Sequence, residues 1–164
     1  MGTGDSRDGE HTPTGLVTGL LLAAGSGSRL GRPKALLEVG GERLVDRGVR
    51  TLTAGGCTPV MVVLGAAETV VRGAHTVHNP DWRTGMGSSV RAGIDALPDT
   101  ADAVLIALAD QPLVTPEAVR RLVRAHEQGA RAAVATYQGN QRNPVLLGRE
   151  HWSAAYAMAV HDVG

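Results

Sequence analysis

The stretch LVTGLLLAAGSGSRLGRPK, residues 16–34, runs from a strongly apolar segment straight into a loop rich in glycine and serine. Its first part, residues 16–24, is apolar almost throughout, which is typical of a strand buried within a sheet. The loop then carries Arg29, Arg32 and Lys34 within six residues. Because glycines let backbone N–H groups approach a ligand and cations neutralise its charge, the stretch predicts an anion-binding loop at a strand end.

Further along the chain, apolar runs alternate with amphipathic segments. Strands are predicted at 16–24, 59–65, 75–79, 101–110, 130–137 and 143–148, and helices at 42–56, 67–74, 87–97, 115–129 and 149–159. The helix over 115–129 has the clearest boundaries, since Thr115 is a typical N-cap, Pro116 is favoured at the first helical position and Gly129 ends the helix.

Near-continuous apolar strands separated by helices predict an α/β fold with a mainly parallel sheet covered on both faces. In open sheets of this kind, ligands bind beyond the carboxyl ends of the strands. The loop 24–34, the stretch 78–89 and Asp110 each follow a predicted strand. We therefore expect all three to lie on one rim of the sheet.

The overall composition favours one soluble domain. With 164 residues the chain can build a sizeable core, and we predict a disordered polar leader over 1–15 followed by the domain over 16–164. Lys and Arg number 16 against 16 Asp and Glu, which disfavours a general surface for nucleic acid or membranes. Without a secretory signal, a membrane-spanning stretch or a second cysteine beside Cys57, the sequence suits the cytoplasm.

Three kinds of phosphate-binding loop compete for residues 24–34. A Walker A loop needs Gly-Lys-Ser/Thr at the helix start, whereas Lys34 follows a proline and precedes an alanine. A dinucleotide fingerprint needs G-x-G-x-x-G, but the glycines here are spaced G-x-G-x-x-x-G, and no acid ends the second strand to bind a ribose. A loop that wraps a triphosphate accounts best for the glycines and cations, and a structural turn with solvated cations is the remaining alternative.

Four segments together resemble a known family. LAAGSGSRLGRPKALL at 22–37 is similar to the signature L-A-A-G-x-S/G-x-R-M-G-x-P-K-x-L-L of the MobA-like nucleotidyltransferases. The other three fit the branch of that family that makes molybdopterin cytosine dinucleotide: NPDWRTGMGSSVRAG at 79–93, LADQPLVTPE at 108–117 and NQRNPVLLGREHW at 140–152. The resemblance runs from about residue 16 to the end of the chain.

The sequence departs from the family pattern in two places. Leu30 stands where methionine is usual, which is a mild change. The last four residues, HDVG at 161–164, resemble the start of the family's G-D-x-G-A-R segment, with His161 in place of glycine and no Ala-Arg after it. We therefore expect the domain to be truncated at its C-terminal end.

The resemblance implies a three-layer Rossmann-like nucleotidyltransferase fold, and transfer of CMP from CTP to molybdopterin with release of pyrophosphate. Chemically, the attacking phosphate monoester has a second pKa of about 6, so it is a nucleophile at neutral pH without a general base. The barrier then lies in bringing two polyanions together, which Mg²⁺ and cationic side chains lower. The product is expected to pass to a molybdoenzyme or its chaperone.

The resemblance also assigns roles to single residues. Arg29 and Lys34 are implied as catalytic residues that hold the triphosphate, and Asp110 as a catalytic residue that binds Mg²⁺ together with Asp162. The implied nucleotide-binding set consists of Leu22, Ala23, Ala24, Gly25, Gly27, Ser28, Arg29, Lys34, Gly87, Ser88, Ser89 and Asp110. Gln111 and Arg142 are implied as contacts of the acceptor. Ser88 and Ser89 equally suit capping of the helix that follows them.

Other functions stay open at this point. Two other enzymes use the same scaffold, namely a GTP-dependent cofactor guanylyltransferase and a sugar- or polyol-phosphate nucleotidyltransferase. A third alternative is a nucleotide- or cofactor-binding chaperone module, which would hand the cofactor to a target enzyme without catalysing a reaction. We expect the protein to use CTP in preference to GTP. The loop begins with LAAG, which contains Ala23 and Ala24, whereas the corresponding segment of the guanylyltransferase branch looks like L-A-G-G followed by x-D-K.

Overall fold

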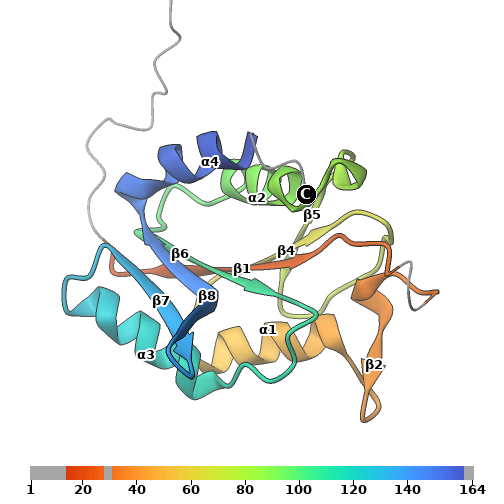
Figure 1. The fold of residues 1–164 in the computed structure, drawn as a ribbon, viewed down its shortest axis with the longest axis horizontal. Coiled ribbons are helices and arrows are strands. Elements are labelled where there is room, and N and C mark those ends of the chain that lie inside the picture. The colour runs from red at the N-terminus through yellow and green to blue at the C-terminus, as the bar shows by residue number, and fades with distance from the viewer. Residues whose placement is uncertain (1–13, 28–30, 161–164) are drawn as a thin grey trace, which may run out of the picture.

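The apolar run at the start of the domain forms β1 (Val17–Ala23), which is buried along its whole length and lies inside the main sheet. A computed structural model of the chain describes residues 14–27 and 31–160 (Figure 1). The strands beside β1 are β4 (Val60–Leu64) and β6 (Ala103–Leu108), and β5 (His75–His78) lies beyond β4. These four strands are parallel.

The remaining two strands of the sheet run antiparallel to their neighbours. β8 (Asn140–Gly148) pairs with β6, and β7 (Ala132–Tyr137) pairs with β8, which gives the order β5-β4-β1-β6-β8-β7. The prediction of a mainly parallel sheet is confirmed. The chain leaves β1 toward β4 and β5 and later returns to the other side of β1 as β6, so the strand order reverses between β1 and β6.

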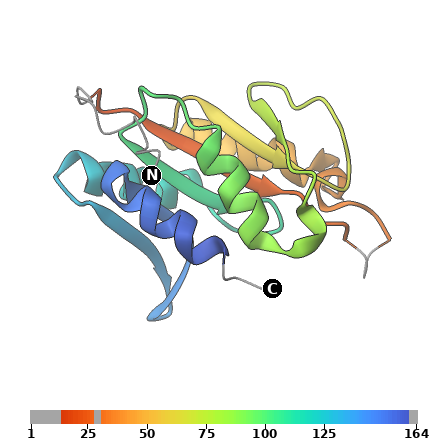
Figure 2. The same ribbon diagram turned by 90° about the horizontal axis from the view of Figure 1, so that it is seen from above.

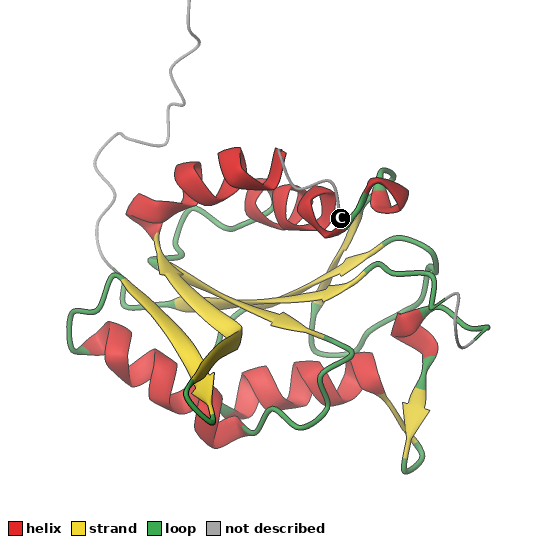
Figure 3. Cartoon of the chain, viewed as in Figure 1, coloured by secondary structure: helices red, strands yellow, loops and turns green. Residues whose placement is uncertain are grey.

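Helices cover both faces of the sheet. α1 (Leu44–Ala54) and α3 (Pro116–Glu127) lie on one face, and α2 (Met86–Asp95) and α4 (Trp152–Val160) on the other (Figure 1, Figure 3). Seen from above, α2 and α4 lie next to each other (Figure 2). Since side chains alternate along a strand, β1 sends Leu21 toward α1 and α3 and Leu20 toward α2 and α4. The predicted three-layer α/β fold is confirmed.

Most predicted helices are present. The segment 149–159 forms a short 3-10 turn, η4 (Arg149–His151), and then α4, while the predicted helix over 87–97 corresponds to α2, which begins one residue earlier and ends at Asp95. At the start of α3 the Thr115 hydroxyl oxygen accepts a hydrogen bond from the Ala118 N–H at 3.2 Å, as its N-cap position predicts. None of the helices within 14–27 and 31–160 is long and apolar enough to cross a membrane.

The predicted helix over 67–74 is wrong, because these residues form neither helix nor strand. The Arg43 guanidinium donates hydrogen bonds to the Thr69 hydroxyl at 2.8 Å and to the Val70 carbonyl at 2.9 Å, which holds this backbone in place. Three β-branched residues in a row, 69–71, also disfavour a helix.

The start of the predicted helix over 42–56 is wrong as well. Residues 42 and 43 form β3 (Glu42–Arg43), which pairs with β2 (Glu38–Val39) in a small hairpin, and α1 begins only at Leu44. The turn consists of Gly40 and Gly41 with φ of +61° and +81°. Two consecutive glycines with positive φ are the signature of a two-residue hairpin turn, which the helical pattern concealed.

Thr14 and Gly15, the last residues of the predicted leader, donate hydrogen bonds from their N–H groups to the Asp102 carboxylate. The rest of the leader, 1–13, lies outside the described residues.

Cys57 is 3% exposed, and burial raises the pKa of its thiol to about 12. This thiol therefore stays protonated and packs as a small apolar group.

Thr18 on β1 is a buried hydroxyl without a partner. Its side chain is 0% exposed, and no group in the described part of the chain hydrogen-bonds its Oγ1. An unpaired buried hydroxyl costs about 1–3 kcal/mol. We expect Thr18→Val, which replaces the hydroxyl by a methyl group, to raise the free energy of unfolding in urea by about 1 kcal/mol.

The matched control is Thr76→Val on β5, where the side chain is exposed. It should change the free energy of unfolding by less than about 0.5 kcal/mol. A Thr18→Val protein that is less stable than wild type would contradict the assignment of an unsatisfied hydroxyl.

Candidate active site

A pocket of about 650 Å³ opens beyond the carboxyl ends of the parallel strands. Its position beside β1 and β6, where the strand order reverses, is the usual ligand site of an open α/β sheet. The lining residues come from the end of β1 and the segment after it, from the turn before α2 and the first turn of that helix, and from the end of β6 and just beyond it: Leu22, Ala23, Ala24, Gly25, Ser26, Gly27, Lys34, Leu37, Trp82, Arg83, Gly85, Met86, Ser89, Leu108 and Asp110. The expectation that these three segments meet on one rim is confirmed.

The glycine loop folds back on itself so that Lys34 returns to the pocket. The Lys34 N–H donates to the Gly25 carbonyl at 3.1 Å, and a Cβ on Gly25 would lie 2.9 Å from Cδ of the lysine. Gly27 has a φ of +59°, and a Cβ there would lie 1.8 Å from the Arg32 carbonyl oxygen. Only glycine therefore fits at 27, and the loop needs it to bring Lys34 back toward β1.

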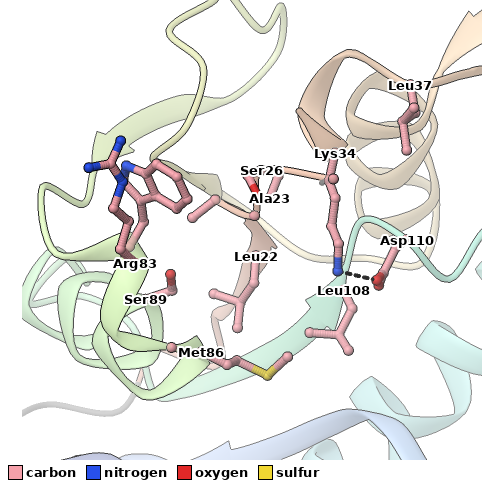
Figure 4. A pocket seen from close by; sticks show the side chains of 15 residues that line it. Leu22, Ala23, Ser26, Lys34, Leu37, Arg83, Met86, Ser89, Leu108 and Asp110 are labelled. Carbon is pink, nitrogen blue, oxygen red and sulfur yellow. Dashed lines mark hydrogen bonds and ion pairs between the residues drawn. The ribbon is translucent and has the colours of Figure 1, made fainter. Parts of the chain in front are cut away.

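Lys34 and Asp110 form an ion pair at one side of the pocket (Figure 4). The Nζ–Oδ2 distance is 2.8 Å, and the two side chains are 40% and 38% exposed. A pair this accessible to water contributes little to stability, about 0–1 kcal/mol. Both groups are therefore available to a ligand at small cost to the fold.

The other side of the pocket is built by the turn before α2. Trp82, in η3 (Trp82–Thr84), packs over Gly65 so closely that a Cβ on that glycine would lie 2.5 Å from Cβ of the tryptophan. The Arg83 guanidinium lies 5.0 Å from the centre of the indole ring, within the range of a cation–π contact. Figure 4 shows Arg83, Met86 and Ser89 on this side, across from Lys34 and Asp110.

The pocket gathers part of the predicted nucleotide-binding set. Eight of its members line the pocket, namely Leu22, Ala23, Ala24, Gly25, Gly27, Lys34, Ser89 and Asp110, while Gly87 and Ser88 are buried next to it. Ser88 makes hydrogen bonds to the backbone carbonyls of Asp81 and Gly85 at 2.9 and 2.8 Å. These bonds hold the turn before α2, but the capping alternative is wrong, because the N-cap of α2 is Gly85 and no side chain makes a cap hydrogen bond there.

Other predicted site residues lie elsewhere. Ser28, Arg29 and Asp162 fall outside the described residues. Gln111 lines a small cavity beside α1 with Arg47, and Arg142 is exposed on β8; neither lines the large pocket. Their proposed contact with the acceptor stays a prediction.

The sequence reasoning left several lining residues without a role, namely Ser26, Leu37, Arg83, Gly85, Met86 and Leu108. All of them lie inside the motifs 22–37, 79–93 and 108–117, so their nearness to predicted residues is the available signal. Met86 is 49% exposed, which a helix pattern alone does not reveal.

The pocket suits a metal that arrives with a substrate. Within residues 14–27 and 31–160 no three His, Cys, Asp or Glu side chains gather closely enough to hold an ion. Mg²⁺ typically takes one or two carboxylates and completes its shell with phosphate oxygens and water. Asp110, an accessible carboxylate on the pocket wall, fits this kind of site.

The chain matches a known domain family and is similar in sequence to characterised proteins. The model of the MobA-like NTP transferase domain matches residues 19–164. Nicotine blue oxidoreductase of Paenarthrobacter nicotinovorans is 46% identical over 142 residues, covering 82% of this chain and 68% of that protein. The 2-C-methyl-D-erythritol 4-phosphate cytidylyltransferase of Streptomyces avermitilis is 34% identical over 145 residues, covering 79% of this chain and 57% of the relative.

Solved structures share the fold. Rv0371c from Mycobacterium tuberculosis H37Rv superposes with a TM-score of 0.78 at 25% identity, covering 88% of this chain and 77% of that one. A manganese complex of Rv0371c gives a TM-score of 0.72 at 22% identity, covering 86% and 75%.

Proposed function

The chain belongs to the MobA-like NTP transferase domain family, and we propose that it transfers CMP from CTP to molybdopterin. The reaction releases pyrophosphate and forms molybdopterin cytosine dinucleotide, which passes to a molybdoenzyme or its chaperone. The observation that carries the proposal is the placement of Lys34 and Asp110 over a glycine loop at the rim of the sheet. A cation and a carboxylate side by side suit a triphosphate and its divalent cation.

In this mechanism the residues position and neutralise charge rather than move protons. Lys34 leaves Asp110 and donates hydrogen bonds to the α-phosphate and to the departing pyrophosphate. Asp110, with Asp162, would hold the divalent cation that accompanies the triphosphate. Arg29 would bind the β- and γ-phosphates, and Ser28 would contact the nucleotide. When bound, Mg²⁺ neutralises the charge that builds on the phosphate oxygens. The manganese complex of Rv0371c supports use of a divalent cation at this fold.

The attacking group needs no base from the protein. The terminal phosphate of molybdopterin is largely ionised at neutral pH, since its second pKa is about 6. The protein's task is then to hold two anions in line within one pocket. Gln111 and Arg142 remain the proposed contacts of the acceptor.

A second candidate function is oxidoreduction, favoured by the 46% identity to nicotine blue oxidoreductase. A nicotinamide dinucleotide usually has its ribose bound by an acid after the second strand of the sheet. Here β4 ends at Leu64 and is followed by Gly65 and Ala66, so that acid is missing. Consumption of NADH or NADPH with nicotine blue as electron acceptor, without pyrophosphate release, would favour this candidate.

The choice of nucleotide gives a testable prediction at Ala24. This residue lines the pocket, is 6% exposed and packs in the core under α2, so its methyl group narrows the site. A methyl group in a pocket discriminates by about 10- to 200-fold. We expect a ratio of kcat/KM for CTP over GTP well above one in the wild type and a lower ratio in Ala24→Gly.

The measurement uses molybdopterin as acceptor and records pyrophosphate release for both nucleotides. A wild-type ratio at or below one would refute the cytidylyl assignment and favour a guanylyltransferase. Turnover of CTP only with a sugar or polyol phosphate would favour the activity named for the Streptomyces avermitilis relative.

A further inference from the structure

A buried amide lies behind the wall of the pocket that the turn before α2 builds, across from Lys34 and Asp110. Asn79, the residue after β5, is 2% exposed, and its backbone N–H donates to the Leu64 carbonyl at 2.7 Å. Its side chain contacts Ser88 and Ser89, which are 6% and 4% exposed. No step of the proposed reaction uses this amide.

The orientation of the Asn79 amide follows from one obligatory donor. The Asp81 backbone N–H can only donate, and it lies 2.9 Å from one end of the amide, which is therefore the oxygen Oδ1. The other end is the NH₂ group. Its two hydrogens point to the Ser88 and Ser89 hydroxyl oxygens, at 2.8 and 3.0 Å.

Both serine hydroxyls must accept from Asn79, since an amide NH₂ cannot accept. Ser88 sends its own hydrogen to the carbonyl of Asp81 or Gly85. Ser89 has no such acceptor among the described residues, and it lines the pocket on the side across from Lys34 (Figure 4). Its hydroxyl hydrogen is therefore left for a ligand.

We infer that Asn79 is a positioning residue that fixes the Ser89 hydroxyl as a hydrogen-bond donor toward the bound nucleoside. This inference rests on the proposed function and adds how the site selects the nucleobase of its substrate. The site takes a nucleobase that presents an acceptor there, either a carbonyl oxygen or an unprotonated ring nitrogen. Cytosine offers both, as its adjacent O2 and N3. Ser88 is the structural member of the pair.

The test is a double-mutant cycle on CTP binding, measured by calorimetry with Mg²⁺. Ser89→Ala removes one donor and should weaken CTP binding by about 3- to 10-fold. Asn79→Asp makes residue 79 accept from both serines, so Ser89 turns a lone pair toward an acceptor on the base. It should weaken CTP binding more than Ser89→Ala does. In the double variant, Asn79→Asp should add nothing.

Two controls separate this effect from damage to the fold. Inorganic tripolyphosphate, which has no base, should bind all variants as it binds the wild type. Thr84→Ala removes a hydroxyl that donates to the Asp81 carbonyl of the same turn without lining the pocket, so it should leave CTP affinity unchanged. If Asn79→Asp does not fold, Asn79→Ala replaces it, with a smaller coupling of the same sign.

Three outcomes would overturn the inference. Ser89→Ala could bind CTP as tightly as wild type, the effects of the two substitutions could simply add, or tripolyphosphate binding could fall in parallel with CTP binding. A wild-type protein that binds neither CTP nor any other nucleoside triphosphate would instead refute the proposed function itself.

Discussion

Asp110→Asn is expected to lower the rate of pyrophosphate release by at least about 100-fold while leaving the fold intact. The amide keeps the shape of the carboxylate but loses the charge that a hard cation requires. The ion pair with Lys34 is lost too, but both partners are more than one third exposed, so stability should change by about 1 kcal/mol or less. Pyrophosphate release and circular dichroism melting measure the two effects.

Asp99→Asn is the matched control for this substitution. Asp99 is an exposed carboxylate shortly before β6, whereas Asp110 follows the other end of the same strand. Its replacement should leave both rate and stability unchanged. An Asp110→Asn protein with wild-type activity at limiting Mg²⁺ would contradict the role of this carboxylate.

Lys34→Ala is expected to cost at least about 3 kcal/mol of transition-state stabilisation, the value of one strong electrostatic donor. The loss should appear in kcat/KM for CTP, because the charge on the α-phosphate and the leaving group grows in the transition state. Lys34→Arg keeps the charge but not the compact ammonium group, so it should recover only part of the activity.

Arg32→Ala serves as the control for the loop. Arg32 is an exposed cation two residues before Lys34 and does not line the pocket, although its carbonyl lies beside Gly27. Its loss should change kcat/KM much less than the loss of Lys34. If Lys34→Ala alters the melting temperature but not the rate, the loop is structural and holds no triphosphate.

Much of this architecture could be predicted because local signals and burial agree. The apolar run 16–24 predicts β1, and the N-cap Thr115 together with Gly129 predicts the bounds of α3. The parallel sheet then brings the loop after β1 and Asp110 to one rim. The pairing of Lys34 with Asp110 follows from that topology once the loop folds back through Gly27.

What could not be predicted depends on contacts between distant residues. The segment 67–74 has a helical pattern but is not a helix. Arg43, which belongs to the β2–β3 hairpin, donates hydrogen bonds to Thr69 and Val70 and so holds the segment in a non-helical conformation. The role of Asn79 likewise depends on the turn that brings Asp81 and Ser89 to its two ends. Sequence spacing alone does not define such a network, since each bond needs the tertiary fold to exist first.

The most direct test of the central claim is a single reaction with the wild-type protein, molybdopterin, Mg²⁺ and CTP labelled at the α-phosphate. Nucleotidyl transfer predicts that the label appears in a dinucleotide of the mass of molybdopterin cytosine dinucleotide, with one pyrophosphate released for each CMP incorporated. A parallel reaction with NADH or NADPH and nicotine blue as electron acceptor, after the name of the 46% identical relative, should show no consumption of the nicotinamide nucleotide. Absence of pyrophosphate with every nucleoside triphosphate, together with oxidation of the nicotinamide nucleotide, would contradict the account and support the oxidoreductase alternative.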